Sequence, residues 1–178
     1  MDETGFLKGD TGRAKVVTGS DGPRWLVTPG NRDWTTVIEA ISAANHGIPA
    51  MVINKGKVHL NIWFDAHLGV PEDWVIAYSN NGWTGDNLGL IWLQKVFIPA
   101  IEGRVIGIWS LLVMNGHGSH CTCQFEEIAR QNYIVPFWLP AHSSHITQPL
   151  DVGVFSSVKQ RYRRGVQDLT GLAKHMLT

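Results

Sequence analysis

Short apolar segments alternate with polar turns along most of the chain, and their composition indicates which of them are strands. Several segments are dominated by β-branched and aromatic residues, and others are brief apolar runs bounded by Gly, Asn or Pro, which favours strands. The predicted strands cover residues 34–42, 48–54, 74–78, 111–114 and 133–139. The turn Asn45-His46-Gly47 predicts an antiparallel hairpin between the first two. Residues 58–64 are apolar, but their pattern does not choose between strand and helix.

Apolar residues at helical spacing predict three helices, which cover residues 87–97, 124–131 and 152–169. We expect Thr84 or Asp86 to cap the first helix and Pro99 to stop it. The second helix is expected to be capped by Ser119 or Thr122. Antiparallel strands therefore precede β-α-β units, which predicts an α/β protein with a mixed sheet covered by helices.

The start of the chain places a carboxylate pair, Asp2-Glu3, directly before glycine and turn chemistry. If Asp2 ends a strand, most of that strand is absent from this sequence. Residues 8–22, rich in Gly, Asp and Lys, read as a loop or a weak edge strand. Because no internal repeat or interdomain linker is visible, we expect residues 1–178 to form a single domain with an apparently truncated first strand.

The composition is that of a globular protein, with 44% hydrophobic and 17% charged residues and no formal net charge. The basic residues are uneven, however, and gather near the C-terminus at Lys159, Arg161, Arg163, Arg164 and Lys174. Such a stretch is either a solvated helix face or a patch that contacts phosphate.

Cellular context is the next expectation. No signal peptide is visible, and no apolar run approaches the roughly 20 residues that span a bilayer. The closely spaced Cys121 and Cys123 favour a reducing compartment. A soluble intracellular protein with no membrane partner is therefore expected.

Two of the predicted strands are followed by residues able to do chemistry. Leu111–Met114 leads into Asn115-Gly116-His117-Gly118-Ser119-His120, and residues 133–139 lead into His142-Ser143-Ser144-His145 and Gln148-Pro149-Leu150-Asp151. Neighbouring strands that deliver polar residues at their C-terminal ends are the usual way in which an α/β sheet forms an active site. We therefore expect residues 111–155 to hold the active site.

Four motifs in this order resemble the DDE endonuclease domain of pogo/Tigger-type transposases, within the wider mariner-type group. They are MDETGF, SNNGWTGDNLGLIWL, LLVMNGHGSH and HSSHITQPLDVGVFSSVKQRY. The resemblance runs from residue 2 to about residue 166. It implies a ribonuclease H-like fold: a five-stranded mixed sheet with helices on both faces, whose first three strands are antiparallel.

The resemblance also implies a catalytic triad of carboxylates that binds two Mg²⁺ or Mn²⁺ ions. Its first member maps to Asp2 and its third to Asp151, while Asn115 stands at the second position, which the family fills with Asp. Thirty-five residues, 116–150, separate Asn115 from Asp151, as expected of the second and third members. An amide is uncharged and offers one carbonyl oxygen, so it is a weaker ligand and cannot bridge two cations. We expect weakened metal binding and impaired cleavage, with little prospect of rescue by Glu3, Glu126 or Glu127.

The histidines allow a second interpretation. His117, His120, Cys121, Cys123, His142 and His145 could be assembled into a zinc site. No CxxC or HxxxH spacing supports a zinc site. The family pattern instead implies that His117, His120 and His145 frame the active site. A purely structural role is the alternative for these histidines. Asn81-Gly82-Trp83 resembles another family motif, in which Asn81 either orients a loop near the cations or forms a turn whose Trp83 covers the core.

The expected function is that of a transposase-derived DDE endonuclease domain that cuts DNA phosphodiesters by two-metal chemistry and is impaired by Asn115. No helix-turn-helix module is visible, so we expect weak, salt-sensitive DNA binding through Lys159, Arg161, Arg163 and Arg164. Alternatives are a non-catalytic DNA-binding protein derived from a transposase and a gene fragment without function. The family implies DNA as partner, no small-molecule substrate and a nuclear location, and a homodimer is one expected assembly.

Overall fold

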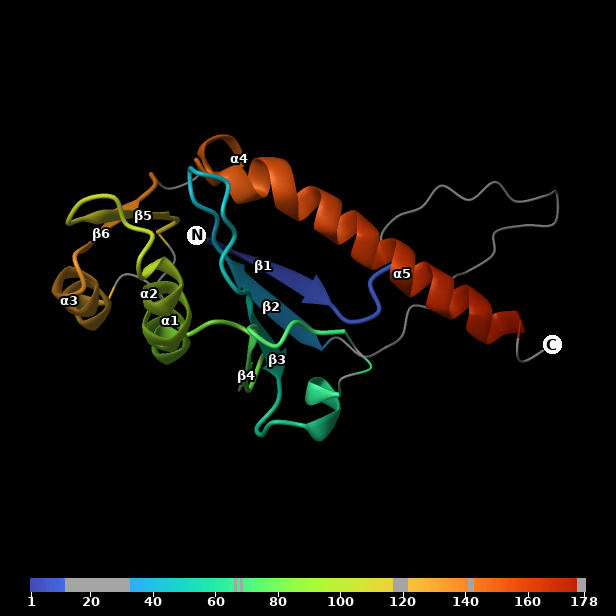
Figure 1. Cartoon of the computed structure of the whole chain (residues 1–178). Coiled ribbons are helices and arrows are strands. Elements are labelled where there is room, and N and C mark those ends of the chain that lie inside the picture. The colour runs from blue at the N-terminus through green and yellow to red at the C-terminus, as the bar shows by residue number, and fades with distance from the viewer. Residues whose placement is uncertain (12–32, 66, 68, 117–121, 141–142, 176–178) are drawn as a thin grey trace.

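The computed structural model describes residues 1–11, 33–65, 67, 69–116, 122–140 and 143–175, and shows a mixed α/β fold (Figure 1). Its strands are β1 (Asp2–Leu7), β2 (Trp34–Glu39), β3 (Met51–Lys55), β4 (Val75–Ser79), β5 (Ser110–Met114) and β6 (Ile134–Trp138). Its helices are α1 (Asp86–Trp92), α2 (Ile98–Ile101), α3 (Cys123–Gln131), α4 (Ser144–Thr147) and α5 (Phe155–His175). Three shorter helical turns are η1 (Asn61–Phe64), η3 (Leu93–Phe97) and η5 (Leu150–Val154).

The first four strands form one sheet in the order β1-β2-β3-β4. β1 and β3 each lie antiparallel to β2 between them, and β4 lies parallel to β3. The predicted hairpin is therefore confirmed, and its turn places Asn45 in the left-handed region with φ of 61°. The undecided residues 58–64 include the 3-10 turn η1, which precedes β4.

β1 runs through the glycine that suggested a turn, and Asp2 begins this strand instead of ending one. Gly5 pairs with Thr36 in the middle of β1. A Cβ atom at Gly5 would lie 2.3 Å from the Trp34 ring, so the absence of a side chain there makes room for the indole. The glycine therefore serves packing within a strand rather than a turn.

β5 and β6 form a separate two-stranded parallel sheet, which corrects the expected single sheet of five strands. Parallel neighbours need a crossover, and α3 supplies it, capped as predicted by Thr122, whose side chain accepts a hydrogen bond from Phe125 N at 3.2 Å. The Met1 amino group bonds to the Val113 carbonyl at 2.8 Å and links β5 to the start of β1.

α1, η3 and α2 form a continuous helical segment over residues 86–101, so Pro99 does not stop the helix. Pro99 lies in the first turn of α2, where a missing N–H is tolerated, directly after the π-helical turn η3. The predicted caps are also wrong, because the N-cap is Gly85 without a side-chain bond and Asp86 is the first helical residue. A carboxylate in that first turn still stabilises the helix dipole.

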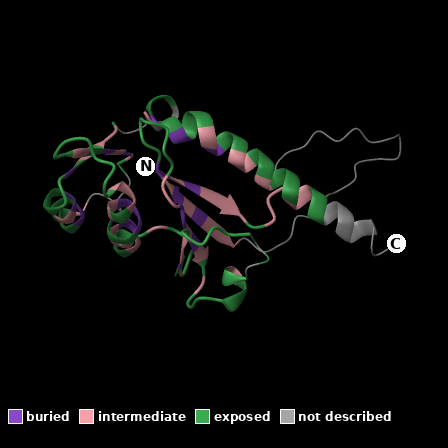
Figure 2. Cartoon of the chain, viewed as in Figure 1, coloured by how far each residue is buried: buried purple, intermediate pink, exposed green. Residues whose placement is uncertain are grey.

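One hydrophobic core contains buried residues of both sheets and of helices packed against them, and Figure 2 shows buried residues in these elements. Its fully covered side chains come from both sheets and from α1, η3 and α3, and include Ile38, Met51, Ile53, Trp92, Leu93, Met114, Phe125 and Ile134. Burial of this apolar surface holds the end of β5 beside the start of β1.

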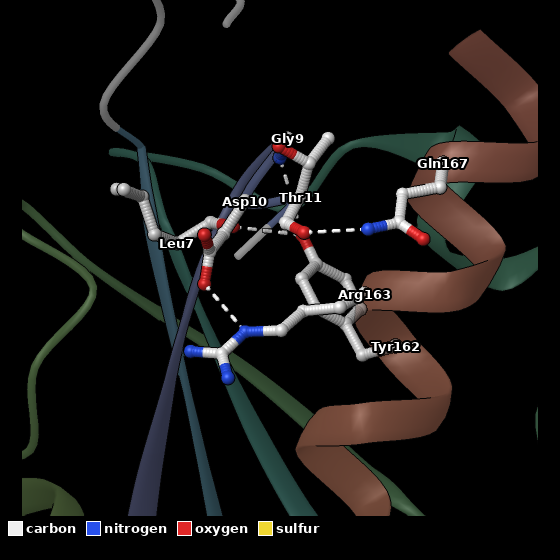
Figure 3. Close-up of polar contacts among 7 residues, drawn as sticks. All are labelled: Leu7, Gly9, Asp10, Thr11, Tyr162, Arg163 and Gln167. Carbon is white, nitrogen blue, oxygen red and sulfur yellow. Dashed lines mark hydrogen bonds and ion pairs between the residues drawn. The ribbon is translucent and has the colours of Figure 1, made fainter. Parts of the chain in front are cut away.

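The long helix α5 runs beside the first sheet (Figure 1). Hydrogen bonds and an ion pair connect it to the C-terminal end of β1 and the residues that follow (Figure 3). The Tyr162 hydroxyl donates to the Leu7 carbonyl at 2.8 Å and accepts from the Gly9 amide at 3.2 Å. Gln167 Nε2 donates to the Thr11 carbonyl at 2.8 Å, and Arg163 pairs with Asp10 at 3.0 Å. These contacts fix the direction of α5.

Tyr162→Phe is expected to lower the free energy of unfolding by about 1–2 kcal/mol, because it removes two partly buried hydrogen bonds while keeping the ring contact with Phe6. Arg163→Ala is the matched control on the same helix. Its ion pair is well exposed, with side-chain exposures of 44% and 33%, and such pairs contribute roughly 0–1 kcal/mol. Urea denaturation measures both, and an equal loss in the two variants would contradict this assignment.

Candidate active site

The predicted triad residues come from three elements that meet at the start of β1. Asp2 opens β1, Asn115 directly follows β5, and Asp151 is the second residue of η5, which continues into α5. Asn115 Nδ2 donates to Asp2 Oδ1 at 3.0 Å. The Asp151 carboxylate lies near enough to Asp2 to raise the pKa of that residue. The structure therefore brings Asp2 together with two residues that are more than a hundred positions away in the chain.

Asp2 is buried, with 2% of its surface exposed. Burial raises the pKa of Asp2 to about 6, and the nearby Asp151 carboxylate acts in the same direction. The Glu3 amide, which donates to Asp2 Oδ1 at 2.8 Å, and the positive Met1 amino group oppose the rise in this pKa. A buried carboxylate beside a second one is a feature of sites that bind cations or protons.

Two buried oxygen atoms at this site have no hydrogen-bond partner among the described residues: Asp2 Oδ2 and Asn115 Oδ1. Buried polar atoms are normally satisfied, so each calls for a ligand. Oxygen atoms of carboxylates and amides are the donors that Mg²⁺ and Mn²⁺ prefer, and Asp151 adds an exposed carboxylate. The residues present thus fit a divalent cation, with two formal negative charges instead of three.

Among the described residues, no group of three or more His, Cys, Asp or Glu side chains converges, but most candidate zinc ligands are not among them. His117, His120, Cys121 and His142 lie outside the described residues, and His145 lies in α4 with an undescribed side chain. Their assigned roles therefore remain predictions. Glu126 and Glu127 are exposed on α3.

The basic residues of α5 differ in their exposure and in their ion pairs within the fold. Arg161 and Arg164 are exposed, whereas Lys159 is half-buried. Arg163 pairs with Asp10, so part of its charge is used within the fold. Arg161 and Arg164 are therefore the stronger candidates for contact with phosphate.

The Asn81 motif forms a turn at the end of the first sheet that lies away from Asp2. Asn81 Oδ1 accepts a hydrogen bond from the Trp83 amide at 3.0 Å, and Trp83 stacks on Trp34 with ring centroids 5.7 Å apart. The register places β4 Ser79 beside Lys55, whereas Asp2 pairs with Glu39 at the other end of the sheet. The turn is present, but Trp83 is 53% exposed and stacks on Trp34 instead of covering the core.

Sequence reasoning missed Gln148, a fully buried side chain whose amide donates to the Met1 carbonyl. The local sequence pattern does not mark this glutamine, which lies three residues before Asp151. The Met1 carbonyl that it contacts lies 147 positions away in the chain. The one indication in the sequence is that Gln148 lies in the motif around Asp151.

The raised pKa of Asp2 predicts a pH dependence of stability. Its ordinary value is 3.8, so between about pH 4 and 6 the folded chain binds a proton that the unfolded chain releases. Protonation of Asp2 therefore stabilises the folded chain. This stabilisation is complete below pH 3.8 and is lost as pH rises towards 6, and the free energy of unfolding falls by about 3 kcal/mol at most. Urea unfolding with a chelator across pH 4–6 measures it. Asp2→Asn, which keeps the acceptor for Asn115, should show a flatter curve, and identical slopes would contradict the assignment.

Comparison with known proteins identifies the family of this chain. The model of the DDE superfamily endonuclease family matches residues 31–175. The chain is also 39% identical over 171 residues to a Cochliobolus lunatus protein named "MFS-type transporter clz9", covering 95% of this chain and 18% of that protein. It thus spans less than a fifth of that relative. No helix in the described ranges is long and apolar enough to cross a membrane.

A solved structure shares the fold. The chain resembles a protein in the crystal structure of a pre-cleavage Mos1 transpososome with a TM-score of 0.50 and 14% identity, over 96% of this chain and 52% of that one. At this identity the likeness concerns the fold, a mixed α/β arrangement of the ribonuclease H-like kind. Together with the family match over most of its length, this shows that the chain belongs to the DDE superfamily endonuclease family.

Proposed function

We propose that this chain is the endonuclease domain of a pogo/Tigger-type DNA transposase whose cleavage of DNA phosphodiesters is impaired by Asn115. The observation that carries the proposal is the convergence of Asp2, Asn115 and Asp151, in which Asp2 Oδ2 and Asn115 Oδ1 are buried and have no hydrogen-bond partner among the described residues. The family match and the fold likeness support it.

The three side chains have separate roles in this proposal. Asp2 and Asp151 would hold the divalent cations, and a bound pair of cations would activate a water or 3′-hydroxyl and stabilise the leaving oxygen. Asn115 supplies one neutral oxygen, while its Nδ2 holds Asp2 Oδ1 in place. Burial of Asp2 excludes water from its carboxylate and strengthens its interaction with any cation that enters.

DNA is the proposed partner, and the nucleus is the proposed location, with a homodimer as the proposed assembly. The exposed Arg161 and Arg164 on α5 would contact phosphates without reading sequence. The Mos1 assembly is described as a transpososome, which supports an oligomer on DNA for this chain.

The salt dependence of DNA binding tests this surface. Changing both Arg161 and Arg164 to Ala should reduce the slope of log affinity against log salt by about 2. The control changes Arg104 and Arg130 to Ala, which removes the same charge from exposed positions elsewhere. Fluorescence anisotropy with a short duplex at several salt concentrations measures both, and equal slopes would rule out α5 as the DNA-binding surface.

A second function has its own supporting observation. The Asn115–Asp2 hydrogen bond partly satisfies Asp2 without any cation, which suits a DNA-binding protein that has lost cleavage. Calorimetric titration with Mg²⁺, followed by measurement of DNA affinity with and without Mg²⁺, separates the endonuclease from the non-catalytic protein. Cation binding that strengthens binding to DNA supports the endonuclease, whereas DNA binding that is indifferent to Mg²⁺ supports the non-catalytic protein.

A further inference from the structure

Gln148 is a buried polar side chain that contacts the chain beside Asp2. It is 1% exposed, and its amide Nε2 donates to the carbonyl of Met1, the residue before Asp2. A buried amide is retained in a fold where it satisfies another buried polar group. Here that group belongs to the peptide that carries Asp2.

The same residue also starts the turn that carries Asp151. The Gln148 carbonyl accepts a hydrogen bond from the Val152 amide at 3.1 Å, which closes the helical turn around Asp151. Gln148 therefore contacts the Asp2 segment through its side chain and the Asp151 turn through its backbone.

Met1 connects this arrangement to the third site residue. Its amino group donates to the Val113 carbonyl at 2.8 Å, two positions before Asn115. Met1 thus lies between β5 and Gln148, and each of the three site residues is within three positions of one of these contacts.

We propose that Gln148 is a positioning residue that sets the separation of Asp2 and Asp151 and thereby the cation affinity of the site. The inference rests on the proposed function and deepens it. Gln148 acts through the Met1 peptide and touches neither cation nor DNA. Metal ligands need placement within about 0.5 Å, and the hydrogen bond across two elements supplies that placement.

The test compares Gln148→Met with Thr36→Val, both in an Asn115→Asp background. Methionine keeps the length of glutamine but cannot donate to the Met1 carbonyl. Thr36 is the matched control, because its buried hydroxyl donates to the Gly82 carbonyl at 2.7 Å in the middle of the first sheet. Each change removes one buried side-chain donor from a backbone carbonyl, so a general loss of stability affects both.

Calorimetric titration with Mn²⁺ well below the melting temperature should give at least tenfold weaker binding for Gln148→Met and less than a twofold change for Thr36→Val. Equal losses in the two variants would overturn the proposal. If Gln148→Met does not fold, Gln148→Asn keeps an amide but shortens the side chain by one methylene, which draws the donor away from the Met1 carbonyl, and it is judged by the same criterion.

Amide hydrogen exchange without metal separates this proposal from the proposed function. If the Asn115→Asp parent binds no Mn²⁺, the endonuclease proposal fails, and the exchange rates at Glu3 and Val152 decide the role of Gln148. Faster exchange at both amides in Gln148→Met than in Thr36→Val supports positioning, and equal rates overturn it.

Discussion

Asn115→Asp is expected to raise Mn²⁺-dependent cleavage of duplex DNA by at least a hundredfold over the native chain. The change restores a third negative charge and a second oxygen at a position 3.0 Å from the Asp2 carboxylate. A carboxylate can bridge two cations, which the amide cannot, and two-metal chemistry depends on that bridge. Gel assays of nicked or cut duplex measure the rate. Native cleavage as fast as that of the variant would contradict the impaired-site interpretation.

The same substitution should have an opposite effect on the metal-free protein. The introduced carboxylate would lack the donor that now satisfies Asp2 Oδ1 and would stand beside two other carboxylates, so repulsion lowers stability. We expect the melting temperature in chelator to fall by several degrees at neutral pH and to recover when Mn²⁺ binds the folded state. Asn115→Leu is the control, because it removes the donor without adding charge and should show no recovery.

Gly82→Ala is expected to destabilise the fold by about 2–4 kcal/mol or to prevent folding. Gly82 has φ of 78°, and a Cβ atom there would lie 2.1 Å from the Trp34 carbonyl oxygen and 3.3 Å from the Lys55 amide. All of these contacts are with backbone, which cannot move aside as a flexible side chain can. The Gly82 carbonyl also accepts the buried Thr36 hydroxyl, so any shift of this turn disturbs the centre of the sheet.

Gly47→Ala is the control for this prediction, since a Cβ atom there meets nothing within 4 Å. It should change the free energy of unfolding by less than about 0.5 kcal/mol. Urea denaturation compares the two variants with the native chain. A Gly82→Ala protein as stable as the Gly47→Ala protein would contradict the packing described for this turn.

Local patterns predicted the secondary structure well where they were strong. The turn at Asn45, the alternation around it and the cap at Thr122 gave the β2–β3 hairpin and the start of α3. Pro99 misled because its effect depends on the hydrogen-bond pattern of the preceding turn, and a π-helical turn there is not visible in the sequence. Gly5 misled for a similar reason, because the Trp34 ring that it accommodates comes from another strand.

The internal contacts of the candidate site could not be predicted from the sequence. The family resemblance implied Asp2, Asn115 and Asp151 as a triad, and the structure brings Asn115 to Asp2. The Arg163–Asp10 pair and the Gln148–Met1 hydrogen bond each join residues more than a hundred positions apart. These contacts and the split into two sheets depend on tertiary packing. The local pattern of a single sequence does not reveal such packing.

In the proposed function, Asp2, Asn115 and Asp151 form a divalent-cation site that one amide weakens. Calorimetric titration of Mn²⁺ into the native chain, Asn115→Asp, and Asn115→Asp with Asp151→Asn tests it most directly. We expect two bound ions for Asn115→Asp, at least tenfold weaker binding by the native chain, and loss of tight binding in the double variant. Indistinguishable titrations of the native chain and Asn115→Asp would contradict it.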